Sequence, residues 1–265
     1  MKNNVLQWSV LFASAIVLFL TGCSKSAKDR IPAWRGIHNA HVYVDLGLSV
    51  KWATVNIGTN SPYDFGNFYK WGETSAVDPC KNVPYKYIER HGRNRTITKY
   101  YCDGENDWNY FGEDDGVVDN KTTLELADDV AAVKWGGQWR MPTFPEWQEL
   151  EQNCYWEWCS DYQGQGARGW LVFKAKSDAD KGKKLYELDK TPATACYSVA
   201  DDAHIFLPTV GVYSQATKGC YWSSSLWVYR PCRARSMFLD CLNVSIEGGS
   251  LRETSQMVRA VCSVE

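Results

Sequence analysis

The clearest helix start in the chain reads Thr143-Phe144-Pro145-Glu146-Trp147-Gln148-Glu149-Leu150. Thr143 can cap the helix, Pro145 lies in the first turn, where proline is tolerated, and Glu146 can reach back to the cap. Trp147 and Leu150 are spaced to share one helix face, so we expect both side chains to meet the core.

A second helix is predicted just ahead of this one. Thr122-Thr123-Leu124-Glu125 has the pattern of a capping box. Leu126, Val130 and Val133 continue it as an apolar stripe at helical spacing, which ends at Trp135.

Strands are predicted on both sides of the two helices. Runs with strand-forming residues and turn signals occupy 41–46, 50–53 and 66–71 before the helices, and 155–158, 169–173, 205–208, 221–225, 236–239, 244–246 and 257–262 after them. Residues 78–118 are rich in Gly, Asp, Asn and Tyr and are expected to form a long loop or insertion. Two helices among early strands, followed by many strands, predict a single α+β domain.

The N-terminus has the layout of a bacterial lipoprotein signal. Lys2 supplies a positive start, and the apolar run Val10 to Leu20 is shorter than the ~20 residues that span a bilayer. Leu20-Thr21-Gly22-Cys23 then resembles a lipobox. We expect a signal peptide at 1–22, lipid on Cys23, a tether over 23–40 and the domain over 41–265. An ordinary cleaved signal with an incidental cysteine is the alternative.

Lipid on Cys23 would make the membrane a partner of the protein. A buried CH₂ contributes roughly 0.8 kcal/mol and one myristoyl chain binds only marginally, so two or three chains would anchor the protein almost permanently. We expect attachment to the bacterial outer membrane, and both the periplasmic side and the cell surface remain open.

Composition limits the classes of function. Hydrophobic residues make up 45% of the chain and charged residues 23%, as in globular proteins with a real core. The net charge of −2 gives no basic footprint, so a nucleic acid is not an expected partner. Aromatic residues reach 14%, with 13 Trp, which suits either a β-rich core or sugar-stacking surfaces.

Cysteine usage fits an exported protein. Ten cysteines are present, and if Cys23 is lipidated the other nine enter an oxidising compartment, where disulfides are expected and at least one thiol is left over. The Cys154 and Cys159 spacing alone does not make a zinc site, because no second close pair or histidine completes it. The nine cysteines are Cys80, Cys102, Cys154, Cys159, Cys196, Cys220, Cys232, Cys241 and Cys262.

Motifs give no support for catalysis, so we expect no enzyme, metal or cofactor. Residues 103–109 alternate oxygen ligands as a calcium loop does, but Trp108 stands where an EF-hand needs glycine, and a solvated loop is favoured. Asp128 and Asp129 are expected on a solvated helix face. No nucleophile elbow, phosphate loop or zinc-protease helix occurs, and the histidines are scattered at His38, His41, His91 and His204.

Several motifs occur in an order that is typical of one family. They are Val44–Ala53, Asn56-Ile57-Gly58 and Trp71-Gly72-Glu73 near the start, Trp135–Thr143 in the middle, and Phe206-Leu207-Pro208, Tyr221–Ser225 and Val258–Val261 near the end. Together they resemble the Fibrobacter succinogenes major paralogous domain, which is abundant in lipoproteins of Bacteroidetes. The departures are Ala260, where the family often has Pro, the extra cysteines and the 78–118 stretch.

This family is similar to C-type-lectin-like domains. The resemblance implies two helices with a mixed, mostly antiparallel sheet whose N- and C-terminal strands pair, so that Val42–Asp45 lies beside Met257–Val261. Sugar binding does not follow from the fold. The Glu-Pro-Asn or Gln-Pro-Asp triplet of calcium-dependent lectins, and their Trp-Asn-Asp triplet, are absent.

Formylglycine-generating enzymes are a second relative of this fold. Arg140–Trp147 is similar to one of their stretches, and Cys232-Arg233-Ala234-Arg235 resembles a segment that follows their metal-binding cysteines. Trp222–Pro231 contains no cysteine, so the thiol pair is missing and this activity is not favoured.

The segment from Trp227 to Arg252 is the predicted binding face. If Met237 and Leu239 point inward, alternation along the strand puts Phe238 and Asp240 outside. Exposed aromatic and arginine side chains carry much of the binding energy at interfaces. We therefore predict a glycan or protein ligand bound by Trp227, Tyr229, Arg230, Arg233, Arg235 and Phe238.

Two alternatives to this binding face stay open. The segment can be an ordinary exposed edge, and the protein can be a structural component of the envelope without a specific ligand. Burial of Trp227, Tyr229 and Phe238 would favour the structural role. The resemblance adds that retroelements diversify this region in some C-type-lectin-like proteins.

Overall fold

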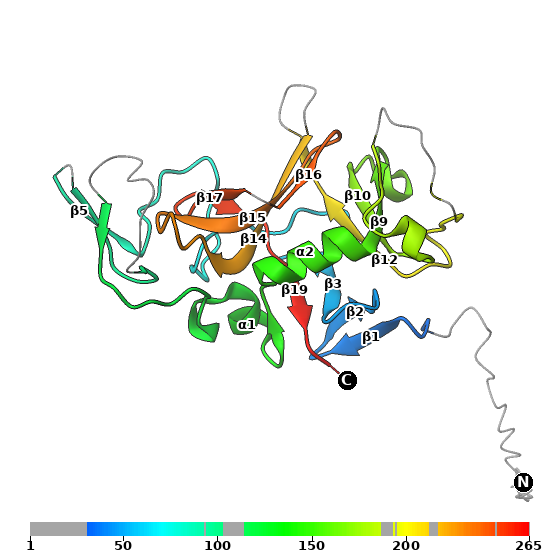
Figure 1. Ribbon diagram of the computed structural model, residues 1–265, viewed down its shortest axis with the longest axis horizontal. Helices are drawn as coiled ribbons and strands as arrows, with labels where there is room; N and C mark the ends of the chain where they lie inside the picture. The colour runs from blue at the N-terminus through cyan, green and yellow to red at the C-terminus, as the bar shows by residue number, and fades with distance from the viewer. Residues whose placement is uncertain are drawn as a thin grey trace, which may run out of the picture. The chain divides into compact units, whose positions relative to one another are not determined.

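The computed structural model describes residues 31–92, 94–102, 114–186, 193, 195–211, 217–246 and 248–264 (Figure 1). The chain divides into two compact units, Met1–Pro32 and Ala33–Glu265. The elements below all belong to the second unit. Cys23 and the acidic stretch 103–109 lie outside the described residues, as does Glu247 of the predicted binding face.

The first sheet contains both ends of the second unit. Its strand order is β1 (Arg35–His38), β2 (His41–Val44), β3 (Lys51–Asn56), β19 (Arg259–Cys262) and β8 (Trp139–Arg140), and all neighbours are antiparallel. The C-terminal strand therefore pairs with β3, where Val261 lies opposite Trp52, and β3 separates it from β2. The expectation that Val42–Asp45 lies directly beside Met257–Val261 is wrong by one strand.

The sheet also begins earlier in the chain than expected. β1 lies within the stretch that the sequence assigned to the tether, and it pairs along its whole length with β2. Asn39 and Ala40, both with positive φ, form the tight turn between these strands.

The next two sheets are built from later strands. One has the order β11 (Lys184–Leu185), β9 (Cys154–Cys159), β10 (Gly169–Lys174) and β12 (His204–Pro208). The other has the order β13 (Val210–Gly211), β14 (Thr217–Leu226), β15 (Arg233–Leu239) and β16 (Val244–Ser245), with β17 (Gly249–Leu251) also paired to β15. The antiparallel pair β9–β10 joins two of the predicted strands, 155–158 and 169–173.

Two small sheets complete the strands of the described chain. β4 (Tyr69–Lys70) pairs with β18 (Ser255–Gln256), and β5 (Ile88–His91), β6 (Asn94–Ile97) and β7 (Asp114–Gly116) form a three-stranded sheet. The 78–118 stretch thus holds strands where a loop was expected. Among the named strand pairs of the described residues only β11–β9 and β6–β7 are parallel, so the fold is a mostly antiparallel, mostly-sheet α+β fold.

The two helices differ in how well the sequence marks them. α2 (Phe144–Asn153) begins as predicted, with the complete capping box between Thr143 and Glu146. α1 (Val130–Trp135) begins later than predicted, after a 3-10 turn at Leu126–Asp128, and Asp129 caps it. Further 3-10 turns occupy Tyr162–Gly164 and Asp178–Asp180. Among the described residues, none of the helices has the length and apolar character needed to cross a membrane.

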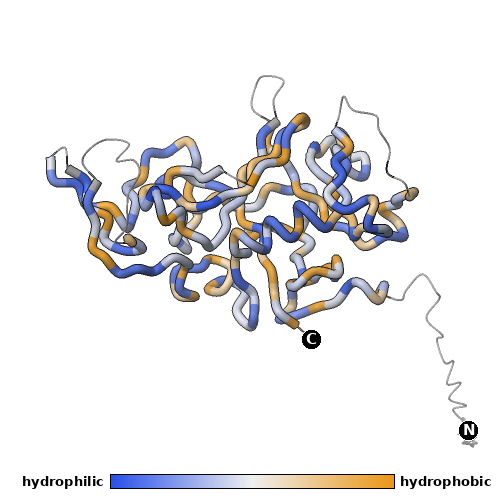
Figure 2. The backbone as a smooth tube through the Cα atoms, in the orientation of Figure 1, coloured by the Kyte–Doolittle hydropathy of each residue, from blue (hydrophilic) through white to orange (hydrophobic). Residues whose placement is uncertain are grey.

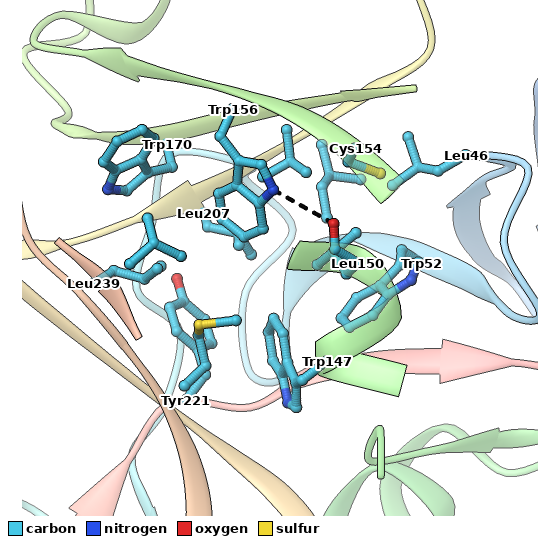
Figure 3. Close-up of a cluster of buried hydrophobic side chains, with 14 of the residues drawn as sticks. Leu46, Trp52, Trp147, Leu150, Cys154, Trp156, Trp170, Leu207, Tyr221 and Leu239 are labelled. Carbon is cyan, nitrogen blue, oxygen red and sulfur yellow. Dashed lines mark hydrogen bonds between the residues drawn. The ribbon is translucent and has the colours of Figure 1, made fainter. Parts of the chain in front are cut away.

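Tryptophan fills the core on both faces of the β14–β15 pair. On one face, Tyr221 and Leu239 pack with Trp147 and Leu150 of α2, and Trp156 donates a hydrogen bond to the Leu150 carbonyl at 3.4 Å (Figure 3). On the other face, Trp222, Leu226 and Ala234 pack into a second apolar cluster. Figure 2 shows how hydropathy varies along the chain, which is mostly apolar in β19 and hydrophilic in β5.

Candidate functional site

The hairpin that closes β14 and β15 forms the centre of the candidate site. Its loop, Trp227–Cys232, consists of two successive turns, with the Arg230 amide bonded to the Trp227 carbonyl at 2.8 Å and the Arg233 amide to the Arg230 carbonyl at 2.7 Å. The Trp227 amide in turn donates to the Arg233 carbonyl at 3.2 Å. These bonds fix the backbone from which Trp227, Tyr229 and Arg230 project.

Arg252 anchors this loop from inside the molecule. Its amide donates to the Cys232 carbonyl at 3.0 Å, and its guanidinium donates to the Pro231 carbonyl at 3.0 Å. Only 1% of Arg252 is exposed. The expectation that Arg252 belongs to the outer binding face is therefore wrong, because the residue is part of the support beneath the loop.

Four aromatic rings enclose the Arg252 guanidinium. Its central carbon lies 4.8 Å from the ring centre of Trp71, 5.5 Å from Tyr85, 5.8 Å from Tyr87 and 5.9 Å from Tyr100. Cation–π attraction of this kind is worth more when the cation is desolvated, as here. The rings come from residues 71–100, so they tie the early part of the chain to the closing hairpin.

Trp227 and two arginines form a stacked cluster on the outside. The guanidinium carbon of Arg230 lies 5.1 Å from the Trp227 ring centre, and that of Arg235 lies 4.4 Å from it. Arg235 also lies 4.5 Å from the ring centre of Phe144, the first residue of α2. Tyr229 stands at the tip of the loop with 61% of its surface exposed.

A groove of about 360 Å³ lies between the start of α2 and the end of β14. Arg235 is the one charged side chain among the described residues of its lining. The other lining residues supply hydroxyl groups or apolar surface, and they are Thr122, Thr123, Thr143, Phe144, Pro145, Ser225 and Leu226.

The structure brings together only part of the predicted set. Trp227, Arg230 and Arg235 meet in the stack, and Arg233 on the same strand face as Arg235 donates to the Gly249 carbonyl at 2.7 Å. Phe238 is half-buried but lies three positions beyond Arg235, so alternation places it on the opposite face of β15. We therefore exclude Phe238 from the candidate site.

Phe144, Thr122 and Gly249 belong to the site but were not predicted from the sequence. Phe144 was read only as part of a helix start, and Thr122 as a helix cap. Gly249 has room for the Trp227 ring only because it lacks a side chain, since a Cβ there would lie 2.3 Å from a ring carbon. Its place in a Gly-Gly pair is the one signal that could have identified it.

A second groove of about 670 Å³ lies under α1. The exposed side chains of Leu126 and Val133 line it, together with Trp139 and Ser263. Both residues belong to the predicted apolar stripe, but Leu126 lies in the 3-10 turn ahead of α1 and both are exposed. Among the described residues that line it, no aromatic–arginine stack is found like that of the first groove.

Asp128 and Asp129 are buried, not on a solvated helix face as expected. Asp129 accepts the amides of Ala131, Ala132 and Met141 at 2.9, 3.2 and 2.7 Å. Asp128 accepts Lys99 at 2.5 Å and the Tyr100 hydroxyl at 2.7 Å. Asp129 therefore holds three backbone amides together, whereas Asp128 joins side chains from other parts of the described chain.

The electrostatics of Asp128 are dominated by its partners. Burial would raise the pKa of its carboxyl, but hydrogen bonds from Lys99, Tyr87, Tyr100 and Lys86 outweigh it and hold the pKa well below its ordinary value. Burial, together with the hydrogen bond to Asp128, raises the pKa of Tyr100 to about 12.

Two buried thiols, Cys154 and Cys262, are not activated. Burial raises the pKa of Cys154 to about 12 and that of Cys262 to about 11, which makes both poor nucleophiles at neutral pH. The expected disulfides are not confirmed, since these two and Cys80, Cys102, Cys159, Cys196 and Cys220 are free. Within the described part of the chain, no three metal-binding side chains gather at one place.

No protein-family model, curated protein or solved structure matches this chain. The resemblance to the paralogous-domain family consequently remains an expectation from the motifs. The candidate site rests on the geometry of the closing hairpin and its groove.

Proposed function

We propose that this protein is a lipoprotein anchored by Cys23 to the bacterial outer membrane, and that it binds a glycan or protein ligand without catalysis. The binding surface consists of Trp227, Tyr229, Arg230 and Arg235 with the adjoining groove. The observation that carries the proposal is the exposed Tyr229 beside the stacked Trp227 and arginines, on a loop that hydrogen bonds hold in place.

Preorganisation favours a binding role for this surface. A ligand that meets a fixed loop does not have to order it, so less of the interaction energy is lost on binding. Aromatic and arginine side chains are also the types that dominate binding energy at interfaces. Trp227 and Tyr229 both keep exposed surface, so neither side chain serves only to fill the core.

The proposed body is a C-type-lectin-like domain. Two helices, a mostly antiparallel sheet and the pairing of β3 with the C-terminal strand β19 support this assignment. The alternative of a structural envelope protein draws support from the many tryptophans in the core. A formylglycine-generating activity is the weakest alternative, because Cys232 is buried and Trp222–Pro231 supplies no second thiol.

A binding screen tests the proposal. The full-length chain in detergent would be screened against panels of glycans and envelope proteins, together with Trp227→Ala and Arg230→Ala. We expect at least one ligand whose affinity falls about tenfold or more in the Trp227 variant. Val133→Ala is the matched control, because it removes exposed apolar surface at the other groove. Absence of any ligand, or equal loss in the control, would refute the proposal.

A further inference from the structure

We propose that the groove under α1 holds an acyl chain of a membrane phospholipid, so that the surface with Leu126 and Val133 faces the bilayer. The proposal rests on the proposed lipid anchor and adds a second contact with the membrane. The groove has a volume of about 670 Å³, and its described lining shares no residue with the groove beside Arg235.

Two exposed apolar side chains flank the groove. Leu126 lies in the 3-10 turn before α1 and is 66% exposed, and Val133 lies in α1 and is 52% exposed. A single apolar residue on a surface needs no explanation, but here two such residues from neighbouring elements line one concave site. Moving both from water into hydrocarbon is favourable in proportion to the apolar area that is buried.

Small residues form much of the groove wall. Ala127 and Ala132 line it beside the two exposed side chains, and Gly137 lines it at the turn that follows α1. Gly137 has a positive φ of 61°, and a Cβ on it would lie 2.8 Å from the Nε2 atom of His38. This turn therefore requires glycine, and the wall there is bare backbone. A slender chain of methylene groups can lie close to such a wall.

The charge of the groove suits a neutral ligand. Arg140 is the one ionisable side chain in the described lining. Its guanidinium donates through two nitrogens to the Glu146 carboxylate, one of them at 2.8 Å, and to the Met141 carbonyl at 3.1 Å. The positive charge of Arg140 is thus already compensated by Glu146, so the groove does not select an anion.

The size of the groove favours a lipid chain over a second copy of the protein. A specific protein–protein interface uses about 20–30 residues on each side. The described lining here comprises nine residues. The volume of about 670 Å³ lies instead within the roughly 300–1,000 Å³ of small-molecule sites.

The proposed anchor brings lipid within reach of the groove. Cys23 stands twelve positions before Arg35, the first residue of β1. Twelve residues span at most roughly 40 Å even when the chain is fully extended. A protein acylated at Cys23 would therefore meet membrane lipid at a high local concentration, so a modest affinity for an acyl chain is enough to fill the groove.

Photolabelling in vesicles tests the proposal. The full-length chain from its native envelope would be reconstituted into vesicles of phosphatidylethanolamine and phosphatidylglycerol that contain a phosphatidylcholine with a diazirine in one acyl chain. Mass spectrometry after illumination locates the labelled residues. We expect label at Leu126 and Val133 about tenfold or more above that at Ile37 and Leu242, which are similarly exposed but do not line the groove.

Two matched variants separate the groove from general exposure. Val133→Asp should lower the labelling of Leu126 about tenfold, because an acyl chain that enters would have to desolvate the new carboxylate. Val117→Asp makes the same change at another exposed valine, which does not line the groove, and should leave the labelling of Leu126 unchanged. Circular dichroism would confirm that both variants are folded.

The outcomes separate this proposal from the proposed anchor. Equal labelling of Leu126, Ile37 and Leu242, or full labelling of Leu126 in Val133→Asp, would overturn the proposal. A dimer that shields Leu126 and Val133 from the probe would overturn it too, since a second copy would then cover the groove. If the chain is acylated and stays on the vesicles without label in the groove, the proposal fails while the anchor stands. If the chain carries no acyl group and leaves the vesicles, both fail.

Discussion

Arg252 is the residue on which the candidate site depends most, although no ligand would touch it. Its guanidinium donates to the carbonyls of Lys99, Tyr100 and Pro231 and to the Tyr85 hydroxyl, at 2.9 to 3.2 Å. A buried charge that makes four hydrogen bonds is tolerated, whereas removing it leaves several buried acceptors without donors. The loop above it then loses its support.

Replacing Arg252 should therefore destabilise the protein strongly. We expect Arg252→Met to lower the free energy of unfolding by about 3–5 kcal/mol. Arg252→Lys should recover only part of this loss, because one ammonium cannot reach all the acceptors. Urea unfolding measures both, and Arg168→Met, at an exposed position, should stay within about 0.5 kcal/mol of wild type. A small effect at Arg252 would contradict the support role.

Asp128 should make the stability of the fold depend on pH. Its folded-state pKa lies below its unfolded value, so its contribution is complete above the unfolded pKa and is lost as the pH falls through the folded-state pKa. Asp128→Asn should cost about 3 kcal/mol at neutral pH, and the difference from wild type should shrink as the pH drops below about 4. Urea unfolding from neutral to acidic pH checks this, and a difference that is constant with pH would contradict it.

At this scale, burial was the property that the sequence could not reveal. Met237 and Leu239 were predicted inside and are buried, because a period of two can be read along one strand. Asp128, Asp129 and Arg252 look like surface residues in the sequence. They are buried because their partners, from Lys86 and Lys99 to Met141, come from other parts of the chain.

Among the elements, the two predicted helix starts show when a local sequence pattern is enough to start a helix and when it is not. The capping box at Thr143 is complete within four residues and was predicted correctly. The same pattern at Thr122 does not start a helix, because β14 competes for that backbone. The Leu124 amide donates to the Ser224 carbonyl, and the Leu226 amide donates to the Thr122 carbonyl, at 2.9 and 2.8 Å.

The two caps can be compared directly by mutation. Asp129→Ala should lower the free energy of unfolding by about 1–3 kcal/mol, because it removes the acceptor for three buried amides. Thr122→Ala should change it by less than about 0.5 kcal/mol, since its side chain caps no helix. Chemical unfolding of the two variants decides this. A larger loss in the Thr122 variant would restore the helix start predicted from the sequence.

The Gly248-Gly249 pair offers a matched test of the stacked cluster. A Cβ on Gly249 would lie 2.3 Å from the Trp227 ring, whereas a Cβ on Gly248 meets nothing within 4 Å. Gly249→Ala should move the Trp227 ring away from Arg235 and weaken ligand binding about tenfold, and Gly248→Ala should leave it unchanged. Calorimetry with the tightest ligand from the binding screen measures the affinity of both variants. Equal affinities would show that the position of the Trp227 ring does not matter for binding.

For the whole molecule, the class of fold was predictable and the exact pairing of strands was not. The number of strand signals around two helices indicated an α+β fold, and the structure confirms it. The insertion of β3 between β2 and β19 depends on register between segments about 200 residues apart, which no local pattern contains. The groove joins Thr122, the start of α2 and β15, so it too arises only from the assembled fold.

The proposed anchor belongs to this scale because it would decide which ligands the proposed binding surface can reach. We expect mass spectrometry of the protein from its native envelope to find acyl chains on Cys23 and no residues before it. Cys23→Ser should move the protein from the membrane fraction to the soluble fraction. An unmodified cysteine, or a membrane association that survives this substitution, would contradict the proposed anchor.

Hydroxyl-radical footprinting tests most directly where a ligand binds. The full-length chain would be oxidised with and without the tightest ligand from the screen, and the modification of individual side chains would be compared by mass spectrometry. We predict that the ligand protects Trp227 and Tyr229 while Leu126 and Val133, at the other groove, stay as reactive as before. Protection of Leu126 and Val133 with no change at Trp227 and Tyr229 would contradict the account.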